Sequence, residues 1–483
     1  MSSAAGAVAD SGSASDSRPH IVIVAGRGEV LRNFLFSDTL SYLAKSARVT
    51  VLSVVDGDAF VRHFSARPER VVRLREYPQP TLVAYLRVLI ENAHDRWQWS
   101  AVARNNWERR DLRAKERRRV WRRRFVKVVS WFLSFRPILR GLTAVKEELA
   151  YRLRPTRDFD ELFEELQPDL VFNGSQIHGI AAELPMRVAR RMGIPTAVFV
   201  FSWDNLTSQT RIFVTYDLYF VWTESIRQEF LRLYPHVEQD RVIATGTPQF
   251  DYHFRPENRL EREELCQRLG IDPARPYVLY TAGIDHHFFE EHLHVRRVAE
   301  LLAGLDLPLR PQLVVRTYTK GTSDEMKALA AEGLPDVIFP PVTWDAEWQT
   351  PKYEDLEIYT SLLKHAALGI NAASTVSLEL MVFDKPIINI RYDPPGSDLP
   401  WCLGFERHIL FDHYWPVAQS GATMVAESDD DMRRMLKRGL ERPDADAEAR
   451  RTFVASFFGD LLDGRAGERI GRLLLDRAQR ESQ

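Results

Sequence analysis

The stretch that decides the fold class is "HIVIVAGRGEVLRNFLFSDTLSYLAKSARVTVLSVVDG", residues His20 to Gly57. A short apolar run, Ile21 to Ala25, is interrupted by two glycines. Leu31 to Leu43 then carries apolar residues at helical spacing, and Val49 to Val55 is a second apolar run. A strand, a glycine turn, a helix and a strand in this order are typical of a parallel α/β sheet. We therefore expect a Rossmann-like, doubly wound domain to begin here.

The same pattern recurs along the chain. "PDLVFNGSQIHGIAAELPMRVARRMGIPTAVFV" (168–200) predicts a strand, a helix ended by Gly193, and a further strand. After a turn with Pro248 the pattern starts again, which predicts two Rossmann-like halves with a hinge near Gly246 to Asp251. The expected organisation is a disordered tail over 1–18, a first domain over 19–247, a second domain over 248–445 and a C-terminal helix over 446–483 that packs back.

Composition excludes several classes of protein. The chain has 483 residues and a net charge of −2, so no overall field attracts it to nucleic acid or to a membrane. The two cysteines, Cys266 and Cys402, are too few and too far apart for a disulfide framework or a zinc site, which favours a reducing, cytoplasmic location. No run reaches about 18 uninterrupted apolar residues, so we expect no spanning helix.

One segment, residues 82–153, fits neither half and is strongly basic. It predicts a helical insertion in the first domain. Its cationic side chains between residues 104 and 127 are Arg104, Arg109, Arg110, Arg113, Lys115, Arg117, Arg118, Arg119, Arg122, Arg123, Arg124 and Lys127. Aromatic residues are interleaved with them: Trp97, Trp99, Trp107, Trp121, Trp131 and Phe132. Two interpretations stay open: a solvated insertion with its aromatics packed on the first domain, or contact with an anionic membrane through residues 97–140. Nucleic acid is not expected, because no recognised motif accompanies the charge.

Polar residues that directly follow strands are the candidate site residues. Two facing Rossmann-like halves place the carboxyl ends of their strands at a shared cleft, where open parallel sheets bind ligands. "SWDNLTSQTR" (202–211) follows a predicted strand, so we expect Trp203, Asp204 and Asn205 to line the cleft. The alternative is a loop of ordinary turn formers, although Trp203 argues against it.

The second half offers a site for phosphate. Asn371 to Thr375 is a small-residue loop between a strand and a helix, and Ser374 and Thr375 would hold a diphosphate there or merely cap the helix. Glu379 lies one helical turn on and could accept hydrogen bonds from ribose. Arg316 ends another strand and suits phosphate, unless it pairs with a carboxylate elsewhere.

The remaining candidates have weaker patterns. Thr281, Gly283, His286 and His287 follow a second-half strand and could line the cleft. Adjacent histidines do not face the same way, so we expect no metal site there. In the first half, Gly28 lies in the first turn, and Glu29 beside it could be a general base. Asp204 and His178 are rival candidates for that role.

Four motifs carry a resemblance to a known family. They are "SWDNLTSQTRIFVTYDLYFVWTESIRQEF" (202–230), "ATGTPQFD" (244–251), "LVVRTYTKG" (313–321) and "NAASTVSLELMVFDKPIINI" (371–390). Together they resemble bacterial surface-carbohydrate biosynthesis proteins with the GT-B fold, relatives of the CDP-glycerol glycerophosphotransferases and of the UDP-N-acetylglucosamine 2-epimerase group. The resemblance covers residues 21–60 and about 168–475, and leaves out the basic insertion.

The resemblance implies a nucleotide-activated donor bound by the second half. Ser374 and Thr375 would hold phosphate, Glu379 the ribose and Arg316 the diphosphate, with the acceptor against the first half. No cofactor is implied beyond the nucleotide-sugar substrate, and no metal, because cationic side chains and a helix dipole stabilise the leaving diphosphate.

The expected function is therefore that of a glycosyltransferase. It would move a sugar from a nucleotide-sugar to a glycan or lipid-linked acceptor in cell-surface carbohydrate biosynthesis. The protein would be cytoplasmic, and contact through the basic insertion would place it peripherally on the inner face of the membrane. Open alternatives are a nucleotide-sugar 2-epimerase, a polyol-phosphate transferase and a non-catalytic GT-B scaffold. Thr317-Tyr318 stands where the glycerophosphotransferases often have Pro-His, which argues against the polyol-phosphate alternative.

Overall fold

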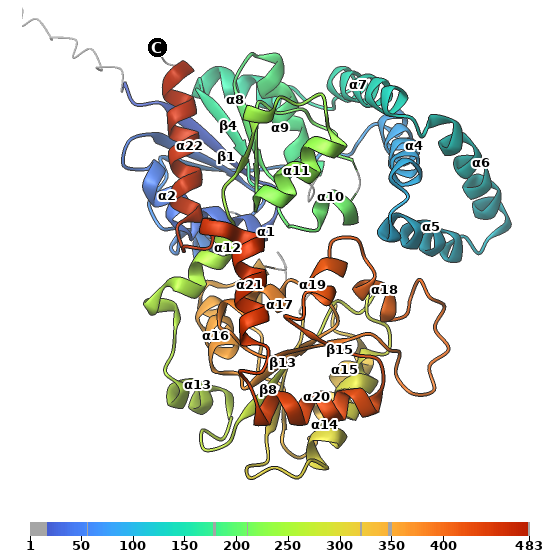
Figure 1. Cartoon of the computed structure of the whole chain (residues 1–483). Coiled ribbons are helices and arrows are strands. Elements are labelled where there is room, and N and C mark those ends of the chain that lie inside the picture. The colour runs from blue at the N-terminus through green and yellow to red at the C-terminus, as the bar shows by residue number, and fades with distance from the viewer. Residues whose placement is uncertain are drawn as a thin grey trace, which may run out of the picture.

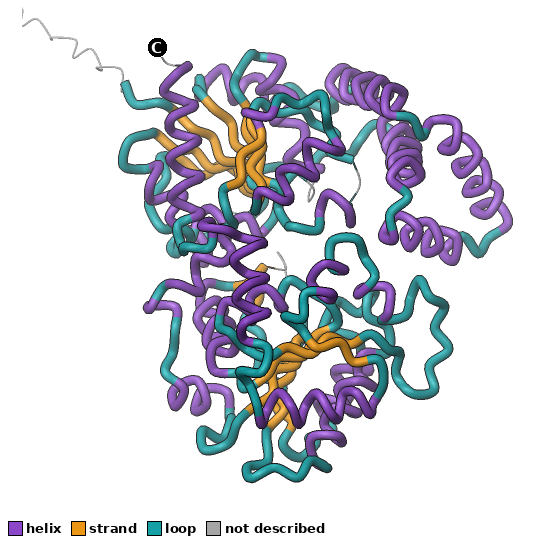
Figure 2. Tube along the Cα trace, viewed as in Figure 1, coloured by secondary structure: helices purple, strands orange, loops and turns teal. Residues whose placement is uncertain are grey.

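Two parallel sheets with flanking helices form two facing α/β domains (Figures 1 and 2). The computed structural model describes residues 17–55, 57–176, 180–209, 211–318, 321–345 and 350–481. The predicted doubly wound architecture is confirmed. The expected N-terminal tail, residues 1–18, lies almost entirely outside the described residues.

The first domain contains a seven-stranded sheet in the order β3-β2-β1-β4-β5-β6-β7. Every strand pair is parallel, and central strand β1 pairs Ile23 with Val51 on one side and with Phe172 on the other. Helices cover both faces, which is why most of these strands read as continuous apolar runs. The strands are β1 His20–Ala25, β2 Arg48–Ser53, β3 Arg70–Arg73, β4 Leu170–Asn173, β5 Thr196–Phe199, β6 Leu218–Val221 and β7 Val242–Ala244. The helices include α3 Asp58–Val61, α8 Asp158–Leu166, α9 Ile180–Arg191, α10 Asn205–Ser208 and α11 Glu224–Leu233.

The second domain contains a six-stranded parallel sheet in the order β10-β9-β8-β13-β14-β15. Its strands are β8 Tyr277–Thr281, β9 Gln312–Arg316, β10 Val337–Ile338, β13 Leu368–Asn371, β14 Ile387–Ile390 and β15 Met424–Ala426. Its helices include α13 Arg262–Leu269, α14 Glu291–Ala303, α15 Asp324–Ala331, α16 Tyr353–His365, α17 Val376–Val382, α18 Glu406–Ile409, α19 Trp415–Gln419 and α20 Asp429–Glu441.

α1 (Gly28–Val30) precedes the predicted helix over Leu31 to Leu43. That helix is itself broken into two pieces, a π-helical turn (Leu31–Leu35) and α2 (Asp38–Leu43). Ser37 separates the last two, because its hydroxyl accepts a hydrogen bond from the Thr39 N–H and caps α2. A short hairpin of β11 (Trp344–Asp345) and β12 (Thr350–Pro351) was not predicted from the sequence.

The C-terminal segment forms two helices, α21 (Ala447–Phe458) and α22 (Ala466–Glu481), where one was predicted. α22 returns to the first domain, where the Thr39 hydroxyl donates to the Gly467 carbonyl at 3.0 Å. The Asp251 carboxylate, at the end of α12 (Pro248–Asp251), accepts from the backbone N–H groups of Ala466 and Gly467 at 3.1 and 2.8 Å. Burial raises the pKa of Asp251 to about 6. The hinge segment that ends with α12 and the segment that leads into α22 are therefore tied together by these hydrogen bonds.

The insertion is a four-helix arm that projects from the first domain (Figure 1). Its helices are α4 Thr81–Gln98, α5 Ala101–Arg113, α6 Arg117–Leu133 and α7 Arg136–Arg152. α5 reaches the second domain, where the Ala101 N–H donates to Asp412 at 2.8 Å and Arg109 donates to the His286 carbonyl at 2.6 Å. Two of the predicted basic side chains are thus engaged in contacts within the protein. Arg109 is buried against the second domain, and Arg123 packs over the ring of Trp107. The interpretation as a solvated insertion with packed aromatics therefore fits Trp107 but not the exposed Trp121 and Phe132, and contact with a membrane remains open for these.

Among the described residues, no single helix has both the length and the apolar character needed to cross a membrane. α6 and α7 meet that test only when they are taken together, and they are bent by 115° at their junction.

Candidate functional site

A cavity of about 360 Å³ lies between the domains at the carboxyl ends of strands from both sheets. The first domain contributes Glu29 and Arg32 after β1, and Ser202 after β5. The second domain contributes residues that follow β8, β9 and β13: Thr281, Gly283, Arg316, Tyr318, Ser374 and Thr375, with Glu379 from α17. The sequence predicts most of these residues, because the carboxyl edge of a parallel sheet is where ligand-binding loops gather. We call this space the cleft cavity.

The loop between β13 and α17 is held in shape by hydrogen bonds between its own side chains and backbone. Asn371 accepts from the Ser374 N–H at 3.0 Å, and the Ser374 hydroxyl accepts from the Val376 N–H at 3.3 Å. Ala373 has φ +60°, a left-handed conformation that costs energy for a residue with a Cβ and is found disproportionately at ligand sites. The loop therefore presents Ser374 and Thr375 to the cavity in a fixed geometry.

Arg316 has one guanidinium nitrogen paired and one unpaired. Its Nη2 donates to Asp355 at 2.5 Å, and the same carboxylate accepts from Trp344 Nε1 and the Thr343 N–H, both at 3.1 Å. Arg316 Nη1 is buried and has no hydrogen-bond partner among the described residues. The predicted pairing with a carboxylate therefore exists, and it fixes the side chain while one donor stays available for an anion.

Glu379 is buried and its carboxylate is already hydrogen bonded. Tyr359 donates to Oε2 at 2.5 Å, and His253 Nε2 and Gln249 Nε2 lie 3.3 and 3.4 Å from Oε1. Burial alone would raise the pKa of Glu379, but the bonds and charge of His253 and the Tyr359 bond outweigh it and lower the pKa. Glu379 therefore links α17 to the hinge as well as lining the cleft cavity.

The loop after β5 anchors one domain to the other. Trp203 is buried, its ring packs against Tyr414 and Phe457 of the second-domain side, and its Nε1 donates to the Thr375 hydroxyl at 3.0 Å. Asn205 is also buried, and its Oδ1 accepts from the Ser202 N–H at 2.8 Å. The tryptophan that argued against an ordinary loop thus packs on the protein itself, directly beside the predicted phosphate-binding hydroxyl.

Asp204 faces a second cavity, of about 280 Å³, which α5 of the arm closes. Its carboxylate accepts hydrogen bonds from the hydroxyls of Ser202 and Ser208. Arg109 lines the same cavity and donates to His287 Nδ1 at 3.0 Å. Burial, followed by the charge of Arg109, lowers the pKa of His287 to about 3, so this imidazole is neutral near pH 7. Ser374 and Thr375 line both cavities, so the two spaces adjoin at this loop.

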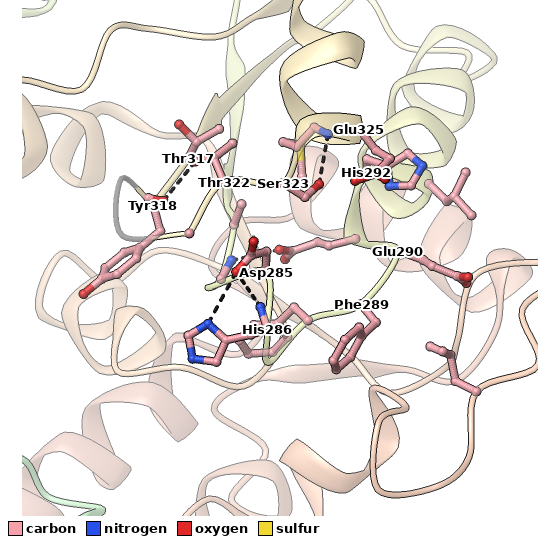
Figure 3. Close-up of a pocket in the computed structure, with 18 residues that line it drawn as sticks. Asp285, His286, Phe289, Glu290, His292, Thr317, Tyr318, Thr322, Ser323 and Glu325 are labelled. Carbon is pink, nitrogen blue, oxygen red and sulfur yellow. Dashed lines mark hydrogen bonds and ion pairs between the residues drawn. The ribbon is translucent and has the colours of Figure 1, made fainter. Parts of the chain in front are cut away.

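A third cavity, of about 650 Å³, lies within the second domain (Figure 3) and shares Gly283 with the cleft cavity. His286 lies here beside Asp285 and outside the cleft cavity, which corrects its predicted position. Its lining includes the acidic side chains of Asp285, Glu290 and Glu325. This negative charge disfavours a diphosphate, so the third cavity is a poor place for a nucleotide-sugar.

Glu291 is a buried acid that the sequence did not single out. It accepts hydrogen bonds from the Gly283 N–H at 2.9 Å and from the Tyr280 hydroxyl at 3.2 Å, and so supports the loop that lines the cleft. Burial raises its pKa from 4.5 to about 8, which keeps this carboxyl protonated at neutral pH.

The other predicted residues have varied positions. Gly28 does not line the cleft cavity; a Cβ there would lie 2.3 Å from Thr350, so this glycine permits close approach of the domains. Thr281 is buried and donates weakly to the Ile370 carbonyl at 3.4 Å, while still lining the cavity. Glu29 lines the cavity and accepts from Arg27 Nε at 3.2 Å. His178 lies outside the described residues.

Comparison with known proteins supports the fold. No family model and no curated protein matches this sequence. Many solved structures match over nearly the whole chain, and three of them serve as examples. A UDP-N-acetylglucosamine 2-epimerase from Neisseria meningitidis bound to UDP-GlcNAc is 12% identical, with 95% of this chain and 100% of that chain covered and a TM-score of 0.51. A UDP-N-acetylglucosamine 2-epimerase from Methanocaldococcus jannaschii is 13% identical, with 94% and 99% covered and a TM-score of 0.53.

The third structure is the S. aureus MnaA–UDP complex, which is 12% identical, with 94% of each chain covered and a TM-score of 0.53. At these identities the likeness concerns the fold, and it confirms the GT-B architecture that the four motifs predicted.

Proposed function

We propose that this protein binds a nucleotide-sugar in the cleft cavity and transfers the sugar to a hydroxyl group of a glycan or lipid-linked acceptor. The reaction would belong to cell-surface carbohydrate biosynthesis. The observation that carries the proposal is the unpaired Nη1 of Arg316, which lines the same cavity as the hydroxyls of Ser374 and Thr375. A buried cationic donor beside two hydroxyl groups suits a diphosphate.

The charge of the cleft cavity supports an anionic ligand. Two of its carboxylates are engaged by the protein: Asp355 by Arg316, and Glu379 by Tyr359. Arg32 also lines the cavity, and it donates hydrogen bonds to the neutral side chains of Asn33 and Gln249, each at 3.0 Å. Both acids are thus held by hydrogen bonds within the protein, and Arg32 and the unpaired Nη1 of Arg316 are the cationic donors that line this space. Two of the similar solved structures are described as bound to UDP-GlcNAc or to UDP, which agrees with this class of donor.

In the proposed reaction, the acceptor oxygen forms a bond to the anomeric carbon as the bond from that carbon to the diphosphate breaks. The acceptor proton passes to a carboxylate, and the negative charge that develops on the leaving diphosphate is stabilised by Arg316 and Arg32 without a metal or further cofactor. Glu29 is the better candidate base, because it lines the cleft cavity. Asp204 accepts from two serine hydroxyls and faces the neighbouring cavity.

The acceptor would approach from the side of the arm. The second cavity adjoins the cleft cavity at Ser374 and Thr375, and its wall includes Arg109 of α5. Because α5 belongs to the insertion and not to either sheet, this wall is where acceptor selection would differ from that of other GT-B proteins.

A thermal-shift screen with UDP-, GDP-, CDP- and dTDP-sugars tests the proposal. A ligand that binds only the folded state stabilises it by mass action and so raises the melting temperature. At a ligand concentration of about one hundred times Kd, the stabilisation is about 2.7 kcal/mol. We expect one nucleotide class to give a shift. No shift with any class would contradict the proposal and favour a scaffold.

Mass spectrometry of the products then separates the enzyme alternatives. A transferase releases the free nucleotide diphosphate only when an acceptor is present. A 2-epimerase instead returns an isomeric nucleotide-sugar, and a polyol-phosphate transferase releases a nucleoside monophosphate. Either of these two products would replace the proposed reaction while leaving the donor site in place.

A further inference from the structure

The outer face of α6 carries an exposed apolar stripe. Its four residues are spaced by four, three and four positions, so they lie on one side of the helix. Their exposed fractions are large: Trp121 62%, Phe125 56%, Val128 59% and Phe132 61%. Side chains of this size and type are rarely left in water together on a soluble protein, which marks the stripe as a contact surface.

The stripe is exposed although the helix itself is firmly packed. On the opposite side, Val126 and Ser130 are buried, and Arg123 and Lys127 donate to Asp111 at 2.8 and 2.7 Å. The inner face of α6 therefore already has its partners within the arm. Within the described part of the chain, the outer face is left uncovered, and α6 itself lies on the side of the arm away from the sheets (Figure 1).

Basic side chains border the stripe on both sides. α6 has seven cationic residues and no acidic one, in a chain whose net charge is −2. Helical spacing places Arg118 and Arg122 on one flank of the stripe, and Arg117 and Arg124 on the other. All four are exposed, and none forms an ion pair with an acidic residue of the described part of the chain.

Further exposed apolar side chains lie near the junction of α6 and α7. Trp131 of α6 and Phe135, which precedes α7, are more than half exposed, and on α7 Ile138 is 40% exposed. Because α6 and α7 meet at 115° and neither could span a bilayer alone, this surface suits contact along an interface and not insertion across it.

We propose that this face of α6, with the start of α7, docks the protein on an anionic lipid bilayer. The aromatic stripe would enter the headgroup region and the flanking arginines would pair with anionic headgroups, the arrangement that favours interfacial helices. The charge argues against a second copy of the chain as the occupant, since two such faces would bring like-charged arginines together. The membrane contact predicted for residues 97–140 is thereby narrowed to 117–138, because Trp107 and Arg109 face inward.

Flotation of the full-length protein with vesicles tests the proposal. With phosphatidylcholine vesicles that contain phosphatidylglycerol, we expect partitioning about tenfold stronger than with phosphatidylcholine alone, and weaker partitioning at high salt. The triple variant Trp121→Ser, Phe125→Ser, Phe132→Ser removes exposed side chains only and should reduce binding about tenfold or more while the protein stays folded. The proposal is contradicted if wild type is recovered equally with both kinds of vesicle. It is also contradicted if wild type and the triple variant are recovered equally with the anionic vesicles.

Matched controls separate a docking face from a general loss of charge or apolar surface. Phe125→Ser is compared with Leu309→Ser, an equally exposed apolar residue of the second domain, at 56% each. The double variant Arg118→Gln, Arg122→Gln is compared with the double variant Arg472→Gln, Arg480→Gln, in which both arginines are exposed residues of α22. We expect only the α6 changes to weaken vesicle binding, and if the controls weaken it equally the proposal is wrong.

Light scattering and nucleotide titration complete the test. If the triple variant loses self-association and keeps vesicle binding, the face is a protein interface and the proposal is wrong. The inference does not depend on the proposed reaction, since none of these residues lines the cleft cavity. The triple variant should therefore keep the donor affinity of wild type, so failure of one proposal leaves the other standing.

Discussion

Replacement of Glu291 by Gln should change how the stability of the second domain depends on pH. The folded protein keeps this carboxyl protonated up to a pKa of about 8, whereas an unfolded chain releases the proton near 4.5. A folded-state pKa above the unfolded value adds stability that is complete below pH 4.5 and is lost as pH rises to 8. The change Glu291→Gln removes this proton linkage, because the amide does not titrate.

The expected size follows from the two pKa values. Between pH 6 and pH 8, this one group lowers the unfolding free energy by about 1.4 kcal/mol per pH unit, or about 2 to 3 kcal/mol in all. For a domain of about 200 residues, that corresponds to a fall in the melting temperature of roughly 5 to 10 °C. The variant should lack this fall, so the difference between the two proteins should change with pH in the same window.

Differential scanning calorimetry at several pH values between 5 and 9 measures this difference. Other buried acids, Asp95 and Asp251, have pKa values raised to about 6, so the comparison with wild type is what isolates Glu291. The neighbouring exposed residue supplies the control, and Glu290→Gln should follow wild type at every pH. If wild type and Glu291→Gln lose stability in parallel from pH 6 to pH 8, the buried, protonated state assigned to Glu291 is wrong.

Three further changes probe the cleft and the domain contact. Trp203→Phe keeps the packed ring and loses the hydrogen bond to Thr375; we expect about 1 kcal/mol of destabilisation in urea unfolding and several-fold weaker donor binding by calorimetry. Gly28→Val places a side chain against Thr350 and should shift the protein to a more open shape, which small-angle scattering would detect as a larger radius of gyration. Arg109→Gln should raise the KM for the acceptor and leave donor affinity unchanged, and a loss of donor affinity instead would contradict the role of the second cavity.

The sequence was informative where local pattern determines structure. The strands at Ile21 to Ala25 and around Ile370 could be predicted because both faces are buried, which makes a strand a continuous apolar run. Asn371 to Thr375 could be assigned to the cleft because loops at the carboxyl edge of a parallel sheet share that position. The broken helix after Gly28 could not be predicted, since the apolar spacing of Leu31 to Leu43 is the same for a continuous helix.

The residues that were missed depend on contacts between distant segments. Arg109 is one of many arginines in the insertion, and only the fold of the arm brings it to His287. Glu291 has no distinguishing pattern, because its pKa comes from burial near Gly283 and not from its neighbours in the chain. The opposite error concerns Trp203, whose position in a polar loop indicated a ligand although the ring packs against the other domain.

Isothermal titration of the matching nucleotide-sugar into wild type, Arg316→Lys and Arg310→Lys is the most direct test of the cleft as a donor site. Both arginines form an ion pair with an aspartate, Asp355 or Asp336, but only Arg316 lines the cavity. Lysine keeps the charge and loses the forked donor, so Arg316→Lys should weaken binding by about ten- to a hundredfold, equivalent to about 1.4 to 2.8 kcal/mol. Arg310→Lys should bind as wild type does. Equal affinities for all three proteins would contradict the assignment of the donor diphosphate to Arg316 and, with it, the proposed site.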